Sequence, residues 1–139
     1  MNIKEIKEMI DKDASFLKEE SNIDIASLSV PELCGKYHQL VYDETMILKY
    51  LKTEYKTIKR DRWMYYTGKS KEPFELVVLK TDIDKFLDAD EQLNASLLKV
   101  QAQEEKVNLL IEQVKSIMNL SYNVTNVIKW KKFLSGESG

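Results

Sequence analysis

The strongest constraint on the fold is a heptad pattern that extends over residues 33–65. Its positions, which step by four and three residues, are Leu33, Tyr37, Leu40, Glu44, Ile47, Leu51, Tyr55, Ile58, Arg62 and Tyr65. This spacing predicts one long helix with a packing seam along its length. A continuous helix over 30–66 would be about 55 Å long, whereas a compact chain of this size is only about 37 Å across. The seam therefore needs a second long helix, other copies of the chain, or both.

A second heptad pattern follows in the last third of the chain. Its positions are Leu93, Leu97, Val100, Glu104, Val107, Ile111, Val114, Met118 and Ser121. The pattern predicts a helix that begins near Asp88 or Asp90 and ends at Leu134. Two long seams in one chain leave faces uncovered, so we expect a homo-oligomer. The residues expected to hold its subunits together are Leu97, Val100, Val107, Ile111, Val114, Met118, Val124 and Ile128.

The remaining segments are shorter. One apolar stripe predicts an N-terminal helix, and it consists of Ile3, Ile6, Ile10, Ala14 and Leu17. Ser29 is the expected N-cap of the first long helix, with Pro31 in the first turn, and Gly68 suits the position after its end. The apolar stretch 74–79 predicts a strand or a buried extended segment. Thr81 is the expected cap of a short turn over 82–87.

We therefore expect an all-α fold with two long helices, an N-terminal helix and a short irregular or β-prone insert. The expectation is a single helical domain over residues 1–139. Its expected parts are the N-terminal helix and connector over 1–28, the basic long helix over 29–68, the insert over 69–88, the C-terminal long helix over 89–134 and a tail over 135–139.

The formal net charge of −2 conceals an uneven distribution of charge. Residues 49–71 carry 8 basic and 2 acidic side chains, a net charge of +6. Residues 1–48 carry a net charge of −5 and residues 72–112 a net charge of −6. A basic island between acidic flanks is typical of a contact with a polyanion.

Basic and aromatic residues alternate within 56–71. The expected contacts with nucleic acid are Lys56, Lys59, Arg60, Arg62, Trp63, Tyr65, Tyr66, Lys69 and Lys71. Cations neutralise phosphates and exposed rings stack on unpaired bases, so this mixture is typical of proteins that bind single strands. The alternative is a structural or adaptor coiled-coil protein that binds no DNA, in which the rings belong to the core and the lysines form a solvated face. Composition alone leaves both interpretations open.

Catalysis is not expected from this sequence. Cys34 and His38 could form a nucleophile and base pair, but no third orienting group accompanies them, so a packed thiol and a surface ring are the better interpretation. Two ligands are too few for a metal site. The tripeptide over 68–70 lacks the upstream glycine of a phosphate-binding loop, because Trp63 occupies that position. We expect neither a cofactor nor a metal.

A cytoplasmic location is the expectation. The single cysteine fits a reducing compartment. No apolar run approaches the roughly 18 residues of a membrane span, so we expect no membrane contact.

The segment over 60–68, Arg-Asp-Arg-Trp-Met-Tyr-Tyr-Thr-Gly, carries a resemblance to a known family. It resembles the basic-x-basic, two-residue, Tyr-Tyr-Ser/Thr-Gly signature of the UvsY family, the recombination mediators of T-even-type phages. The segment over 82–90 is similar to that family's short acidic helix, which ends in a Ser/Asp-Ala-Asp turn, and the ending over 132–136 is also similar. The resemblance covers roughly residues 35–136.

The resemblance implies a protein without catalytic activity that forms closed rings of six or seven subunits in the cytoplasm of an infected bacterial host. It implies binding to single-stranded DNA, to a RecA-like recombinase and to a single-strand-binding protein, which the recombinase then replaces on the strand. The two basic positions that the family links to DNA binding are Arg60 and Arg62 here. Trp63 and Met64 differ from the smaller or more polar residues of the family, so a stacking role for Trp63 is inferred from this sequence alone.

Overall fold

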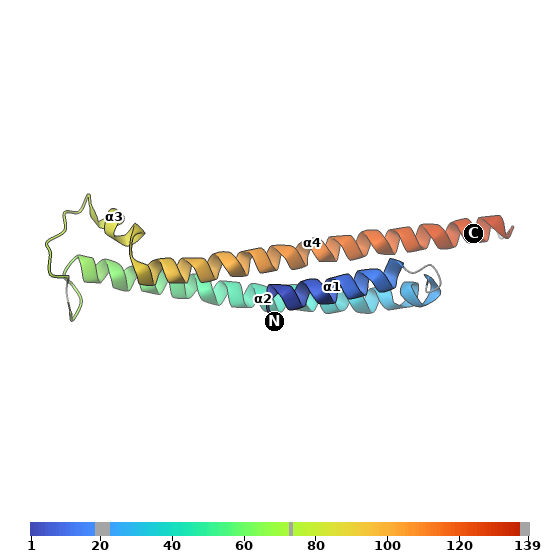
Figure 1. Cartoon of the computed structure of the whole chain (residues 1–139), viewed down its shortest axis with the longest axis horizontal. Helices are drawn as coiled ribbons and strands as arrows, with labels where there is room; N and C mark the ends of the chain where they lie inside the picture. Colours follow the sequence, from blue (N-terminus) through green and yellow to red (C-terminus); the bar gives the residue numbers. More distant parts are fainter. Residues whose placement is uncertain (19–22, 73, 137–139) are drawn as a thin grey trace. The chain divides into compact units, whose positions relative to one another are not determined.

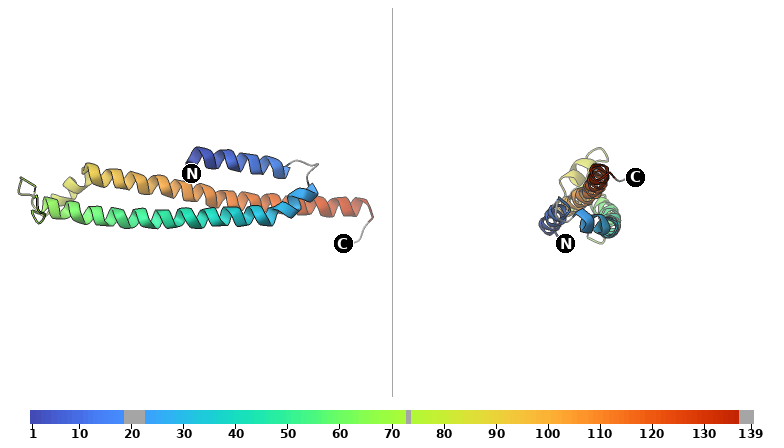
Figure 2. Two further views of the ribbon diagram at one scale, coloured as in Figure 1. Left: turned by 90° about the horizontal axis from the view of Figure 1, so that it is seen from below. Right: turned by 90° about the vertical axis from the view of Figure 1, so that its right-hand side faces the viewer.

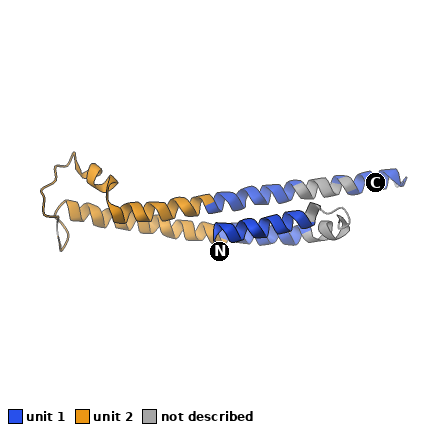
Figure 3. Ribbon diagram, in the orientation of Figure 1, with its two compact units in different colours: residues 1–42, 106–139 blue, residues 43–105 orange. Residues whose placement is uncertain are grey.

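The computed structural model describes residues 1–18, 23–72 and 74–136, with side chains for all of these except 17–18, 23–29, 120–125 and 127. The described residues form α1 (Ile3–Lys18), α2 (Ile23–Tyr66), α3 (Ile83–Asp88) and α4 (Glu91–Leu134), and they contain no strand (Figure 1). The predicted all-α fold is therefore confirmed. The chain divides into two compact units, unit 1 with residues 1–42 and 106–139 and unit 2 with residues 43–105 (Figure 3). The expectation of a single domain stays a prediction.

Unit 1 is a packing of three helical segments, α1 and the parts of α2 and α4 that belong to this unit (Figure 2). Its buried core consists of Ile6, Ile10, Val30, Tyr37, Leu110, Val114 and Ile117. The predicted stripe of α1 accounts for its share of this core, since Ile6 and Ile10 are the buried residues among the described side chains of that helix. Of the other stripe residues, Ile3 and Ala14 are half-buried and the side chain of Leu17 lies outside the described residues.

Hydrogen bonds cap the start of α1 and join α1 to α2. The backbone N–H of Glu5 donates to Asn2 Oδ1 at 2.8 Å and that of Asn2 donates to Glu5 Oε2 at 3.0 Å, which is a capping box. Asp13 Oδ2 accepts from the Tyr37 hydroxyl at 2.7 Å and from Lys36 Nζ at 3.0 Å. Burial, together with the neighbouring Asp13 carboxylate, raises the pKa of Tyr37 above its ordinary value. The hydroxyl therefore stays protonated and keeps α1 tied to α2.

Unit 2 pairs residues 43–66 of α2 with residues 91–105 of α4, and the insert and α3 complete it. Ile83, Leu87 and Leu93 form its apolar core. A polar pair lies in the same seam, because Gln103 Nε2 donates to Glu44 Oε2 at 2.6 Å and to the Glu44 carbonyl oxygen at 2.9 Å. Both residues are buried. Such a pair fixes which residues of two helices face each other, as a buried polar residue does in a coiled coil.

The predicted start of α2 is wrong. The helix begins at Ile23, so Ser29 lies inside it and Pro31 is an internal residue, while residues 19–22 of the expected connector lie outside the described residues. A proline removes one helical hydrogen bond and usually marks a helix start, which explains the error. Val30, next to the proline, is buried in the core of unit 1, and burial of an apolar side chain offsets a loss of this kind.

The insert is irregular, as expected, but the prediction that residues 74–79 form a strand or a buried extended segment is wrong. Leu76, Val77 and Leu79 are 63%, 98% and 68% exposed, so the stretch is neither a strand nor a buried segment. A strand needs a partner edge, and the described chain offers none. The residue before α3 is Asp82 rather than Thr81.

The packing seam of α4 differs from the predicted one at every second step. Its buried residues are Leu93, Ser96, Val100, Gln103, Val107, Leu110, Val114 and Ile117. The prediction shares every seventh residue with this seam, but between them it chose the next residue along the chain, for example Ile111 instead of Leu110. In α2 the prediction instead chose the preceding residue, because it placed Ile47, which is 46% exposed, in the seam where the half-buried Leu48 lies.

The expected subunit contacts on α4 therefore fall into different environments. Val100, Val107 and Val114 are buried within the chain, Leu97 and Ile128 are half-buried, Ile111 and Met118 are exposed, and the side chain of Val124 lies outside the described residues. Of the described positions, Ile111 and Met118 leave the most apolar surface exposed in the single chain. Their role between subunits stays a prediction.

Candidate nucleic-acid interface

The end of α2 is a tight turn built on glycine. The N–H of Lys69 donates to the Met64 carbonyl at 2.8 Å and that of Gly68 to the Tyr65 carbonyl at 3.2 Å, with Gly68 at φ +77°. This is the Schellman arrangement, so the predicted role of Gly68 after the helix end is confirmed. The insert then returns to the helix, because the Phe74 N–H also donates to the Tyr65 carbonyl, at 3.1 Å.

Four rings pack beside this turn, and we call them the aromatic cluster. Its members are Tyr65, Tyr66, Phe74 and Phe86. Their ring centroids lie 5.1–5.6 Å apart, mostly edge to face, the arrangement that aromatic side chains prefer. The structure thus gives the two tyrosines a packing role between α2, the insert and α3. Their contact with bases stays a prediction.

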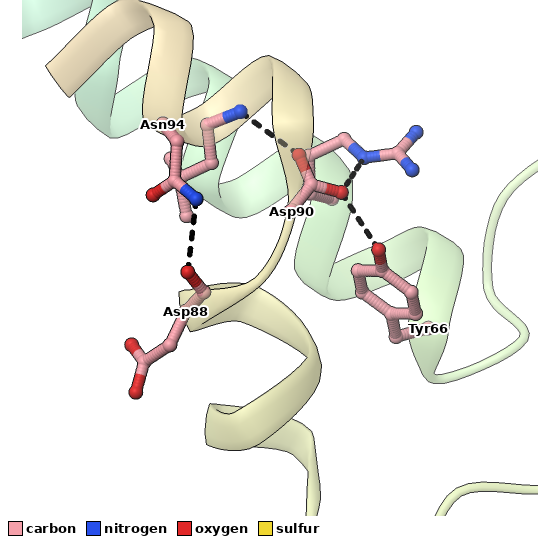
Figure 4. A network of polar contacts seen from close by, with 6 residues as sticks. Tyr66, Asp88, Asp90 and Asn94 are labelled. Atoms are coloured by element: carbon pink, nitrogen blue, oxygen red, sulfur yellow. Dashed lines mark hydrogen bonds and ion pairs between the residues drawn. The ribbon is translucent and has the colours of Figure 1, made fainter. Parts of the chain in front are cut away.

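Asp90 is the centre of a buried polar cluster, which we call the Asp90 cluster (Figure 4). Its Oδ1 accepts from the backbone N–H of Leu93 at 2.8 Å, so Asp90, one of the two residues predicted near the start of α4, is its N-cap. Its Oδ2 accepts from Arg62 Nε and from the Tyr66 hydroxyl, both at 2.7 Å. One carboxylate, only 3% exposed, therefore holds the end of α2 against the start of α4.

The pKa shifts in this cluster favour an ionised Asp90, a protonated Arg62 and a neutral Tyr66. Burial by itself would raise the pKa of Asp90, but the hydrogen bonds from the Leu93 N–H, the Tyr66 hydroxyl and Arg62 outweigh it, and the pKa lies below its usual value. Burial and the Asp90 carboxylate raise the pKa of Tyr66. Burial by itself would lower the pKa of Arg62, but the hydrogen bond to Asp90 outweighs it, and the pKa lies above its usual value. The arginine also lies over the Tyr65 ring, 4.3 Å from the centroid.

A separate group of cations lies on the exposed side of α2, and we call it the basic face. It consists of Lys49, Lys52, Lys56, Lys59 and Arg60. Steps of three and four residues place these side chains on one side of the helix, and all of them are exposed. Lys56, Lys59 and Arg60 were predicted from the sequence, whereas Lys49 and Lys52 were missed, although the same helical spacing identifies both.

The acidic residues near the basic face do little to neutralise it. Glu54 and Asp61 are the acidic residues of the stretch 49–66, and the helical repeat places both on another side of α2. Asp61 pairs with Arg60 at 3.1 Å, but both side chains are more than half exposed. Lys52 pairs with Glu104 at 3.4 Å, again in water. Exposed pairs of this kind contribute about 0–1 kcal/mol and are easily exchanged for phosphate.

Trp63 lies at the end of the basic face and differs from the two tyrosines. Its side chain is exposed, and Lys69 Nζ lies over its ring, 4.5 Å from the centroid. The two residues line a hollow of about 540 Å³, the Trp63 hollow, together with Val78, Lys80, Ile83 and Asp84. Lys80 was not among the predicted contacts, because it is distant in sequence from the basic segment.

The predicted contacts thus divide into two groups. Lys56, Lys59, Arg60, Trp63 and Lys69 lie on or next to the basic face. Arg62, Tyr65 and Tyr66 lie on the packed side of α2. Arg62 and Tyr65 line another hollow, of about 450 Å³, with Lys71. The buried hydroxyl of Ser70, in the same hollow, has no hydrogen-bond partner among the described residues.

The residues considered for other chemistry lie elsewhere. Cys34 is half-buried against the core of unit 1, and His38 is exposed. Among the residues that the structure describes, no three histidine, cysteine or carboxylate side chains come together as a metal site. Over the same residues, no helix combines the length and hydrophobicity needed to cross a bilayer.

Comparisons with known proteins agree on one family. The model of the family described as "Recombination, repair and ssDNA binding protein UvsY" matches residues 5–137. Two crystal structures of the recombination mediator protein UvsY of bacteriophage T4, in different lattices, superpose with TM-scores of 0.87 and 0.86 at 14% and 13% sequence identity. The first match covers 97% of this chain and 98% of that one, and the second covers 96% and 99%. No curated protein matches the sequence.

Proposed function

We propose, from the premise that this chain belongs to the UvsY family, that it binds single-stranded DNA and acts as a recombination mediator. The observation that carries the proposal is the basic face of α2. It presents five exposed cations on one side of a helix in a chain whose net charge is negative. A local cation surface on an acidic chain fits phosphate binding better than general solubility does.

The mediator role requires more than strand binding. We infer that the protein contacts a RecA-like recombinase and a single-strand-binding protein, and that it promotes replacement of the second by the first on the strand. The family resemblance supports these partners. The protein would act without catalysis in the cytoplasm of an infected bacterial host.

Self-association gives the basic face its strength in this proposal. One such face offers only a few phosphate contacts, but a ring of six or seven copies presents them together, so binding of one segment of the strand raises the effective concentration of the next. The exposed apolar side chains of Ile111 and Met118 on α4 support a contact between copies. The buried residues Val100, Val107 and Val114 would then support the ring only by stabilising each subunit.

Salt dependence of strand binding tests the proposal. In a titration of a fluorescent oligothymidylate, each phosphate neutralised contributes about −0.7 to the log–log salt slope. Replacing Lys56 and Arg60 by Gln should make the slope less negative by about 1.4 while the mass of the oligomer is unchanged. The matched control replaces Lys99 and Lys115, which are exposed lysines of α4, and it should leave the slope as it is.

Two outcomes would contradict the proposal. A wild-type protein that binds no single strand at low salt would favour the structural coiled-coil alternative. Equal losses in the basic-face variant and in the control would show that only net charge matters.

A further inference from the structure

We propose that the Trp63 hollow holds one unpaired nucleotide, with its base on the Trp63 ring and its phosphate beside Lys69 and Lys80. The inference deepens the proposed function and depends on it, since the ligand is a unit of the bound strand. It assigns a base-contacting site to a surface where the basic face provides only phosphate contacts.

The Trp63 ring is exposed to solvent beside the cations of the basic face. The aromatic cluster shields Tyr65 and Tyr66, whereas Trp63 is 38% exposed at the end of a cationic helix face. A large exposed aromatic side chain next to phosphate-binding cations is the combination with which proteins stack single-stranded bases. Covering the ring therefore removes apolar surface from water, and the neighbouring cations favour a negatively charged ligand as the group that covers it.

The size and lining of the Trp63 hollow suit a single nucleotide. Its volume of about 540 Å³ lies in the range of small-ligand sites. Val78 and Ile83 supply apolar surface for the base, and the insert carries Lys80 to the hollow from outside the basic segment. Two lysines against the single carboxylate of Asp84 leave a net positive charge. That carboxylate can accept a hydrogen bond from a base N–H, and it repels the phosphate toward the lysines.

Lys69 already covers the Trp63 ring, so a base must displace the lysine in order to stack there. Its ammonium lies 4.5 Å from the centroid of the Trp63 ring, where a stacked base would lie. An exposed cation–π contact is worth about two- to fivefold in an equilibrium constant, and a stacked base about 5- to 150-fold. A base therefore displaces the ammonium, which becomes available for the adjacent phosphate.

Tryptophan fluorescence tests this assignment. The chain has two tryptophans, so Trp130→Phe leaves Trp63 as the one source of tryptophan fluorescence. Sedimentation confirms that the variant keeps the mass of the wild type. A short oligothymidylate should quench the emission. An abasic strand of the same length should bind through its phosphates with a similar salt slope and leave the emission unchanged.

Affinity measurements provide the second readout. Trp63→Leu keeps apolar volume but has no aromatic face, so it should lower affinity for the short oligothymidylate by about 5- to 150-fold and leave affinity for the abasic strand unchanged. Trp63→Phe should restore most of the loss. Lys80→Gln should lower the affinity for both strands and make the salt slope less negative by about 0.7. Circular dichroism confirms that each variant is folded.

The results separate this inference from the function it depends on. Binding of both strands with equal quenching, or with none, overturns the site and leaves the proposed function standing. A loss of abasic affinity in Trp63→Leu as large as that for oligothymidylate also overturns it. If the wild-type protein binds neither strand, both proposals fall.

Discussion

Removing the carboxylate of Asp90 should be one of the most costly single substitutions in unit 2. In Asp90→Ala, α4 loses its N-cap, which costs about 1 kcal/mol. The buried end of the ion pair also disappears, and loss of one partner of such a pair costs about 3–5 kcal/mol when the other charge stays buried. The Arg62 side chain is 22% exposed, so water takes up part of its charge. We therefore expect the free energy of unfolding to fall by about 3 kcal/mol, at the low end of that range.

The assay is urea denaturation followed by circular dichroism at one fixed subunit concentration, since oligomer formation contributes to the measured stability. Asp90→Asn keeps a capping side chain without the charge, and should cost about 1–2 kcal/mol. Asp88→Ala is the matched control, because Asp88 is exposed and the Asn94 side chain bonds to its backbone carbonyl, not its carboxylate. It should change stability by less than about 0.5 kcal/mol.

Two further measurements bear on the same reasoning. Because the folded-state pKa of Asp90 is depressed, its contribution to stability is complete above the unfolded value of about 3.9 and is lost as the pH falls from there through the folded value. Asp90→Asn should lack this part of the acid dependence. In a double-mutant cycle, Arg62→Leu and Asp90→Ala together should cost about 1–3 kcal/mol less than the sum of the single changes. A cost below about 1 kcal/mol for Asp90→Ala, or strict additivity, would refute the argument.

Three other predictions have defined outcomes. Gly68→Ala should lower stability by about 1 kcal/mol in the same assay, because a Cβ there meets nothing within 4 Å and only the φ of +77° opposes it. Glu44→Leu should lower the free energy of unfolding by about 1–3 kcal/mol, because it leaves the Gln103 amide buried without its carboxylate partner. Adding Gln103→Leu removes that amide and should recover most of the loss. A double variant as unstable as the single one would argue against a simple polar pair. Met118→Asp should lower the sedimenting mass with the helices intact, whereas Val107→Asp, at a site only 6% exposed, should unfold the chain; unchanged mass in Met118→Asp would remove α4's exposed positions from the proposed interface.

Local signals predicted the helix end before Gly68 and placed the start of α4 near Asp88 or Asp90. Gly68 follows α2 because a left-handed backbone position favours glycine, and Asp90 precedes α4 because its side chain caps the first turn. Both preferences depend on a few adjacent residues, so the sequence contains them in full. The start of α2 was missed for the opposite reason. Pro31 has a strong local preference for the first turn, and packing of Val30 in unit 1 overrides it.

The phase of the α4 seam could not be predicted, because two patterns with steps of four and three share every seventh residue. The observed seam contains the polar residues Ser96 and Gln103, whereas the predicted one contains the more apolar Leu97. Only the partner helix decides between them, since Gln103 is buried where Glu44 faces it. The same limit applies to the aromatic residues. Trp63, Tyr65 and Tyr66 are adjacent in sequence, and the partners supplied by Phe74 and Phe86 decide which of them are covered.

The two arginines that the family resemblance connects with DNA binding differ in the structure, and this affects how their substitution is interpreted. Arg60 is exposed and has one weak pair in water, so its loss should remove phosphate attraction and little else. Arg62 joins α2 to the buried Asp90 through Nε, which leaves the N–H groups of its two terminal nitrogens outside that bond. A phosphate could bind there only on an arginine that Asp90 already orients. Loss of Arg62 would therefore lower stability before it reveals any effect on the strand, so a change in strand affinity is evidence of a DNA contact only where the unfolding free energy of the same variant has been measured.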